Sequence, residues 1–148
     1  LPPGTGDIQP TMAQKIPVAG AVIVTTPQDI ATLDARKALK MFEKLGIAVL
    51  GLVENMAVHV CTQCGHAEHL FGEGGAARMS AQYGVPVLGS LPLEIGIREQ
   101  GDAGMPIVAA HPDAAPSQAY RDIARAMLAQ LDKRPKLRSG IMASLLGS

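Results

Sequence analysis

GAVIVTTPQDIATLDARKALKMFEKLGIAVLGLVEN, residues 20–55, is the stretch that decides the fold of this 148-residue chain. It opens at residues 20–27 with a short apolar, β-branched run that ends in a proline, as expected of a buried parallel strand. A window with helical spacing follows at residues 28–46, and a second apolar run occupies residues 47–55. A strand, a helix and a strand in this order predict a right-handed βαβ unit.

The helix expected between these strands should bury one face against the sheet. Its apolar residues recur at helical spacing, and Gly46 supplies a stop signal at the carboxyl end. The positions expected on the buried face are Ala31, Ala35, Ala38, Leu39, Phe42 and Leu45.

Strands and helices continue to alternate toward the carboxyl end. The pattern predicts a helix at residues 74–84, a strand at 85–92, a short helix at 93–101, a proline-rich connection at 105–116 and a last helix at 117–133. Ser117 is the expected N-cap of the last helix. Its expected buried face holds Tyr120, Ile123, Ala124, Met127, Leu128 and Leu131. This alternation predicts an α/β fold, a mostly parallel sheet flanked by helices.

Charge and hydropathy exclude several classes of function. Thirteen basic and thirteen acidic residues give a net charge of zero, which argues against binding to nucleic acid or to an anionic membrane. The longest apolar runs, such as residues 18–24 and 47–53, are much shorter than the roughly 20 residues that span a bilayer. Because no signal-peptide pattern opens the chain, we expect a soluble, cytoplasmic protein.

The first seven residues, LPPGTGD, form a glycine- and proline-rich turn that begins with Leu1. Independent domains usually place their termini at an exposed, polar boundary, so we expect this chain to be a fragment. We expect residues 1–134 to form one part of a larger domain, and residues 135–148 to be a flexible tail, first basic and then apolar.

Both cysteines lie in CTQCGH, within an irregular segment, residues 56–75, that we expect to be a long functional loop. Two residues between cysteines let both sulfurs reach one metal, as in zinc and iron–sulfur sites, but two thiolates fill only half of a four-coordinate site. Either histidines such as His59, His66 or His69 complete the site, or a second subunit does, since a twofold dimer brings four cysteines to its axis. A thioredoxin-like disulfide would need the pair at a helix N-terminus, and the next helical window begins several residues later.

The motifs PPGTG, ENM and CxxCG occur in this order along the chain, each within a longer segment. These segments are LPPGTGDIQ, residues 20–47, VLGLVENMAVHVCTQCGH, FGEGGAARMSAQYGVPVLGSLPL and IREQGDAG. Together they resemble the carboxyl-terminal half of the Mrp/ApbC family, P-loop ATPases that carry iron–sulfur clusters to apoproteins. The resemblance implies a partial P-loop NTPase fold of the SIMIBI type. The family's amino-terminal Walker A half has no counterpart in this sequence, so we expect no ATPase activity from these residues alone.

The resemblance also implies a nucleotide site. Gly4 would lie near the terminal phosphate of MgATP, and Asn55 with the backbone around Pro92 and Leu93 would form the wall of the base site. All but Gly4 lie at predicted carboxyl ends of strands, where ligands of such sheets bind, and an amide can both donate to and accept from an adenine edge. From local chemistry alone, a plain turn is the better interpretation of PPGTG, and a turn-former or cap is the better interpretation of Asn55.

For the cysteines, the resemblance implies a [4Fe–4S] cluster that bridges a homodimer through Cys61 and Cys64 of each subunit, with apo iron–sulfur proteins as acceptors. An alternative of another class stays open. The chain could be a non-enzymatic, dimeric interaction domain that shares a structural zinc ion through the same two cysteines.

Overall fold

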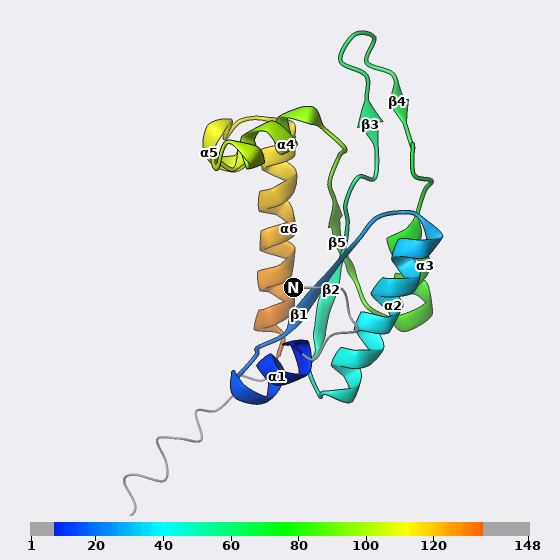
Figure 1. Cartoon of the computed structure of the whole chain (residues 1–148), viewed down its shortest axis with the longest axis vertical. Helices are drawn as coiled ribbons and strands as arrows, with labels where there is room; N and C mark the ends of the chain where they lie inside the picture. The colour runs from blue at the N-terminus through cyan, green and yellow to red at the C-terminus, as the bar shows by residue number, and fades with distance from the viewer. Residues whose placement is uncertain (1–7, 135–148) are drawn as a thin grey trace, which may run out of the picture.

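The computed structural model describes residues 8–134 and has a central sheet with helices against both faces (Figure 1). The sheet consists of β1 (Ala21–Thr25), β2 (Val49–Glu54) and β5 (Val87–Ser90). Their order is β1-β2-β5, and both neighbouring pairs are parallel. The α/β fold predicted from the alternation of elements is therefore confirmed. Gly4 and the tail at 135–148 lie outside the described residues.

Helices α2 (Asp29–Lys44) and α3 (Gly75–Tyr83) lie against one face of the sheet, and α6 (Ala115–Asp132) lies against the other (Figure 1). Two shorter helices, α4 (Ile95–Asp102) and α5 (Ile107–Ala110), connect β5 to α6. Helix α1 (Ile8–Lys15) precedes β1. Sequence patterning missed α1, and it missed α5 inside the connection predicted at 105–116. In the described part of the chain, no helix combines the length and apolarity that crossing a bilayer requires.

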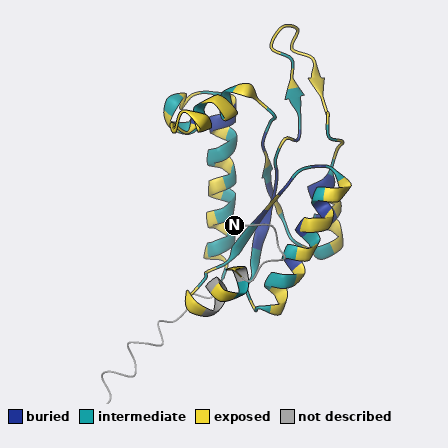
Figure 2. Cartoon of the chain, in the orientation of Figure 1, coloured by how far each residue is buried: buried dark blue, intermediate teal, exposed yellow. Residues whose placement is uncertain are grey.

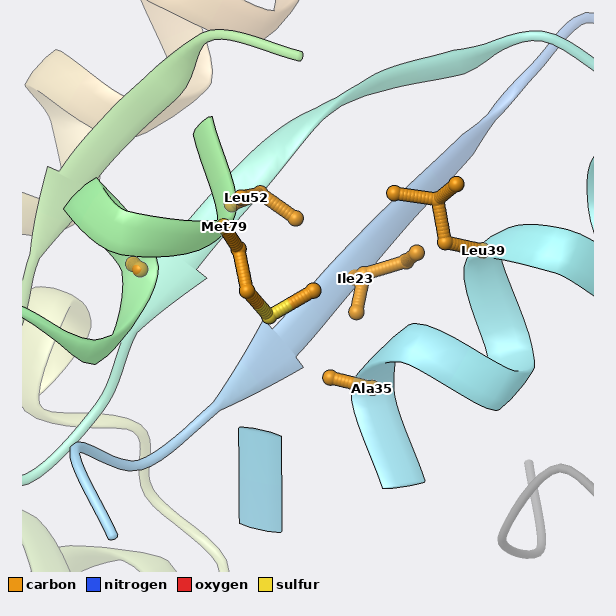
Figure 3. Packing of buried hydrophobic residues seen from close by; sticks show 6 residues of the cluster. Ile23, Ala35, Leu39, Leu52 and Met79 are labelled. Carbon is orange, nitrogen blue, oxygen red and sulfur yellow. The ribbon is translucent and has the colours of Figure 1, made fainter. Parts of the chain in front are cut away.

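The main hydrophobic core lies between the sheet and the layer of α2 and α3. Ile23 of β1 and Leu52 of β2 point toward Leu39 of α2 and Met79 of α3, as Figure 3 shows. Each of these four side chains is 5% exposed or less. Burial of one such side chain contributes about 1.5–3 kcal/mol, so this cluster fixes both helices on the sheet.

The buried face of α2 largely follows the prediction. Ala35 and Leu39 are buried, and Ala38 and Phe42 pack at the margin of the core. The structure adds Thr32, which is 2% exposed. Its hydroxyl donates to the backbone oxygen of Asp29 at 2.9 Å, and this hydrogen bond lets a polar residue occupy a core position.

Helix α6 begins at Ala115, two residues before the predicted start, because Pro116 is well suited to the first turn of a helix. The prediction of Ser117 as N-cap is therefore wrong. Ser117 is fully buried, and its hydroxyl lies 2.6 Å from the oxygen of His111 and 3.1 Å from that of Ile107. The predicted buried face is also partly wrong, since Ala124 and Leu128 are exposed. The residues that pack on the sheet are Ala119, Tyr120, Ile123, Ala126 and Met127.

The segment at 56–75, expected to be a loop, contains a β-hairpin. Strand β3 (His59–Val60) pairs antiparallel with β4 (Ala67–Glu68). We call residues 59–68 the cysteine hairpin, because its tip contains Cys61 and Cys64. Residues 57–60 form its outgoing leg, and residues 67–73 form its returning leg. The hairpin projects beyond the rest of the molecule (Figure 1), and its surface is almost entirely exposed (Figure 2).

Candidate functional site

The carboxyl ends of the parallel strands meet at one edge of the sheet, where open α/β folds bind their ligands. Asn55 follows β2 directly, and Pro92 and Leu93 lie just after β5. The N–H of Leu91 donates to the oxygen of Glu54 at 2.8 Å, which continues the pairing beyond the strands. The structure thus brings the three described residues of the predicted base site to one edge.

The side chain of Asn55 also shapes the backbone at this edge. Its Oδ1 accepts a hydrogen bond from the N–H of Met56 at 3.0 Å, and Met56 has a φ of 55°. A left-handed conformation is uncommon for a residue other than glycine, and here it redirects the chain as β2 ends. Asn55 therefore forms the local turn, while its side-chain NH₂ group can still donate to a ligand.

Sequence reasoning placed Glu54 at a strand end but assigned it no role, and the structure shows that its side chain is only 8% exposed. Its Oε2 accepts a hydrogen bond from the N–H of Ala76 at 2.7 Å. The first N–H groups of a helix lack partners within the helix, and a carboxylate is well suited to satisfy them. Glu54 therefore joins the end of β2 to the beginning of α3.

Gly75 makes this close approach of α3 possible. A Cβ atom at that position would lie 2.8 Å from the oxygen of Pro27 and 2.9 Å from Cγ2 of Thr32. The start of α3 therefore packs directly on the turn between β1 and α2. This packing fixes the beginning of α3 relative to that edge of the sheet.

The cysteine hairpin continues directly from the same edge. The N–H of Ala57 donates to the oxygen of Leu91 at 3.0 Å, and the N–H of Leu93 donates to the oxygen of Val58 at 2.8 Å. His59 forms a parallel bridge with Leu93, and its Nδ1 lies 3.2 Å from the oxygen of Leu93. The segment predicted to line the base site is thus hydrogen-bonded to the first leg of the hairpin.

At the tip, a tight turn presents the two cysteines. The N–H of Cys61 donates to the oxygen of His66 at 2.9 Å, and the N–H of Gly65 donates to the oxygen of Cys61 at 2.8 Å. Gly65 has a φ of 72°, a conformation that glycine adopts without steric cost. Both cysteines are free thiols; Cys61 is partly exposed and Cys64 is exposed.

The turn also favours the ionised form of Cys61. The backbone N–H groups of Cys64 and, next, Gln63 hydrogen-bond to the sulfur of Cys61 and lower its pKa, and the Cys64 side chain adds to the effect. Partial desolvation of the thiol and, after it, the charge of Glu68 act in the opposite direction and raise the pKa. Because the thiolate is the form that binds metals, this turn fits a thiophilic metal centre such as iron–sulfur or zinc.

His66 lies in the tip turn, where its backbone oxygen accepts from Cys61, whereas His59 and His69 lie toward the base of the hairpin and make other contacts. Nδ1 of His69 lies 2.7 Å from the oxygen of Ala57, and Nε2 lies 2.8 Å from Oε1 of Glu73. Across residues 8–134, no group of three or more His, Cys, Asp or Glu side chains is placed to hold a metal ion. The structure brings Cys61 and Cys64 together in one turn but does not gather the histidines around them. It also places the cysteine pair away from any helix N-terminus in the described chain, unlike a thioredoxin-type disulfide.

Known proteins match most of this chain. Residues 1–128 match the family described as ParA, NUBPL iron-transfer P-loop NTPase. The chain is 63% identical over 124 residues to an iron–sulfur cluster carrier protein of Pseudomonas fragi. The matched region covers 84% of this chain and 43% of that protein. The chain is 53% identical over 131 residues to an iron–sulfur cluster carrier protein of Escherichia coli K12. This matched region covers 88% of this chain and 36% of that protein. The chain therefore spans less than half the length of these curated relatives.

A solved structure agrees with the sequence matches. The nucleotide-binding protein of Archaeoglobus fulgidus, in complex with ADP, has a TM-score of 0.61 and 41% identity, covering 70% of this chain and 43% of that one. The likeness supports the parallel sheet as part of a P-loop fold. The resemblance to iron–sulfur cluster carriers noted in the sequence is confirmed by the match over residues 1–128, and the chain belongs to the NUBPL iron-transfer family of ParA-type P-loop NTPases.

Proposed function

We propose that this chain is the cluster-binding part of an iron–sulfur cluster carrier, with Cys61 and Cys64 as its cluster ligands. The observation that carries the proposal is the turn at the hairpin tip, which exposes two thiols and directs backbone N–H groups at the sulfur of Cys61. The printed names of the relatives from Pseudomonas fragi and Escherichia coli support the same function. No relative reported above supports the alternative of a structural zinc domain.

We propose that a second copy of the chain supplies the remaining ligands. Two thiolates are half of the four that a [4Fe–4S] cluster takes, and a twofold axis between two hairpins would provide the other two. The hairpin tip is exposed and projects from the body (Figure 1), which leaves it accessible to the tip of a second copy. The cluster is cargo in this arrangement, held in the cytoplasm where thiols stay reduced.

Transfer to an apo iron–sulfur protein then needs no change in the cluster itself. Acceptor thiolates replace the thiolates of Cys61 and Cys64 one at a time, and iron, sulfide and electrons are conserved. The acceptor thiol loses its proton as it binds iron, and the released cysteine can take up a proton. An exposed hairpin tip suits this exchange because an acceptor cysteine can reach the iron from solvent.

We also propose that the edge formed by Asn55, Pro92 and Leu93 binds the base of an adenine nucleotide, as MgATP in a longer protein. The structure from Archaeoglobus fulgidus is described in complex with ADP, which supports a nucleotide site in this fold. Gly4 belongs to the same proposal, near the terminal phosphate. The hydrolytic step is assigned to the longer protein, since this sequence has no Walker A motif.

Anaerobic reconstitution with iron and sulfide tests the cluster proposal. We expect about four iron and four sulfide ions per two chains, with a native mass of a dimer. Cys61→Ser/Cys64→Ser should abolish this uptake, whereas Thr62→Ser, a change between the same two cysteines, should retain it. Tight binding of zinc without sulfide would support the structural zinc alternative, and absence of any metal uptake would contradict both.

A further inference from the structure

The ring of His69 connects parts of the chain that are separate in sequence. His69 follows β4 on the returning leg of the hairpin. Its Nδ1 lies 2.7 Å from the oxygen of Ala57 on the outgoing leg, and its Nε2 lies 2.8 Å from Oε1 of Glu73, just before α3. A carbonyl oxygen can only accept, so Nδ1 is the donor in the first contact. Nε2 forms an ion pair with Glu73 when the ring is protonated.

A second carboxylate closes a ring of contacts at the base of the hairpin. Glu54 accepts the hydrogen bond from the N–H of Ala76, which fixes the first turn of α3 to the end of β2. Ala57 follows Glu54 closely on one leg, and Glu73 precedes Ala76 closely on the other. The contacts of Glu54 and His69 therefore fix both legs to the same part of the sheet.

The contacts of residues 57–59 with Leu91 and Leu93 hold the outgoing leg at the sheet edge, and beyond them little else determines the direction in which the hairpin points. Its two strands have two residues each, and none of residues 60–73 is buried. Hydrophobic packing, which fixes α2 and α3 on the sheet, is therefore absent from this stretch. A few hydrogen bonds at the base must hold the hairpin instead.

We infer that His69 and Glu73 are positioning residues of the proposed cluster site, which fix the two legs of the cysteine hairpin and so the direction of Cys61 and Cys64. We call the contacts of His69 with Ala57 and Glu73 the His69 clasp. In this role His69 is not a metal ligand, because both of its ring nitrogens are already engaged. The consequence for the cluster rests on the proposed function, whereas the clasp itself is a property of the chain.

Amide hydrogen exchange of the 148-residue chain tests the clasp without any metal. His69→Ala removes both contacts, and we expect exchange at the N–H groups of Cys61 and Gly65 to become about fivefold faster, as the loss of one or two hydrogen bonds implies. His69→Asn should restore part of the protection, because its NH₂ group can replace Nδ1 as donor to Ala57 but cannot reach Glu73 as well. Glu73→Ala should have an intermediate effect. His111→Ala, at an exposed histidine distant in sequence from the hairpin, is the matched control and should change nothing.

Cluster retention tests what the clasp does for the site. We expect the reconstituted His69→Ala protein to lose its cluster to a chelator about fivefold faster than the parent chain, with unchanged iron content and an unchanged electron paramagnetic resonance spectrum after reduction. Mutation of a group that orients a metal ligand directly typically lowers the affinity for the metal by about 10–100-fold. We expect a smaller effect here, because His69 acts through the hairpin backbone. Partial recovery of retention in His69→Asn would support a positioning role.

Two results would overturn the inference. A changed spectrum or a lower iron content at saturation in His69→Ala would make His69 a cluster ligand. Unchanged hydrogen exchange in His69→Ala would mean that the clasp does not hold the hairpin. If the parent chain takes up no cluster, the proposed function fails, while the exchange measurements still decide whether the clasp exists.

Discussion

The sheet core and the cysteine hairpin belong to one short chain but are held by different interactions. In the core, side chains such as Leu39, Leu52 and Met79 have no exposed surface at all. In the hairpin, no residue from 60 to 73 is buried, and the strands pair over two residues each. The core is stabilised by apolar burial, whereas the hairpin depends on backbone hydrogen bonds and on the His69 clasp.

This difference separates stability from the proposed function. Burial is shared among many side chains, so a change in the core weakens the whole fold. The hairpin contributes little buried area, so a change at its tip can alter the cysteines while the sheet remains intact. An exposed metal site is also accessible to another protein, which a carrier needs. The same exposure leaves its geometry dependent on a few hydrogen bonds.

Leu39→Ala should produce the largest effect on the core side of this comparison. Leu39 has 0% exposure and lies in the cluster with Ile23 and Met79, so truncation leaves a cavity. We expect the free energy of unfolding to fall by about 2–5 kcal/mol, measured by urea denaturation of the whole chain.

The control for this substitution lies on the same helix. Leu33 is 46% exposed, and Leu33→Ala should change the free energy of unfolding by less than about 0.5 kcal/mol. Equal effects of the two substitutions would mean that α2 does not present Leu39 to the core. Hydrogen exchange at the hairpin tip should stay unchanged in Leu33→Ala.

The sheet could be predicted because its elements have strong local signals. The apolar runs that became β1 and β2 are bounded by Pro27 and Asn55, and α2 carries a clear helical period between them. The prediction was wrong for the start of α6, where a serine suggested an N-cap and a nearby proline set the true beginning. Helix α1 was missed because its sequence lacks a distinct apolar face, and α5 because it has only four residues.

The site was predictable only in part, for a different reason. The spacing of Cys61 and Cys64 is visible in the sequence, and so is the turn residue Gly65. The strands of the hairpin are too short for an alternating pattern, so the segment read as a loop. The contacts of Glu54 with α3 and of His69 with Ala57 depend on the folded chain and have no local signature.

Gly65→Ala should produce a smaller effect, confined to the hairpin. Gly65 has a φ of 72°. This left-handed conformation costs about 1–2 kcal/mol for a residue that has a Cβ atom, such as alanine. We expect faster hydrogen exchange at Cys61 and weaker cluster retention, with an unchanged midpoint of urea denaturation. Gly101→Ala in α4 is the control, since a Cβ there meets no atom within 4 Å, and it should affect neither hairpin property. A large loss of global stability in Gly65→Ala would show that the tip is coupled to the core.

The reactivity of Cys61 should show the smallest effect and the most local one. Because the N–H groups of Cys64 and Gln63 lower the pKa of Cys61, folding increases the thiolate fraction near neutral pH. In a Cys64→Ser variant, which keeps both N–H groups, alkylation of Cys61 by iodoacetamide should be faster in the folded chain than in urea. The two rates should converge at alkaline pH, where the thiol is ionised in both states. Adding Gly65→Ala should reduce the difference, because the turn that directs the N–H groups is then strained. Slower alkylation in the folded chain would mean that shielding of the sulfur outweighs these hydrogen bonds, and the tip would then be less open to an acceptor than its exposed surface indicates.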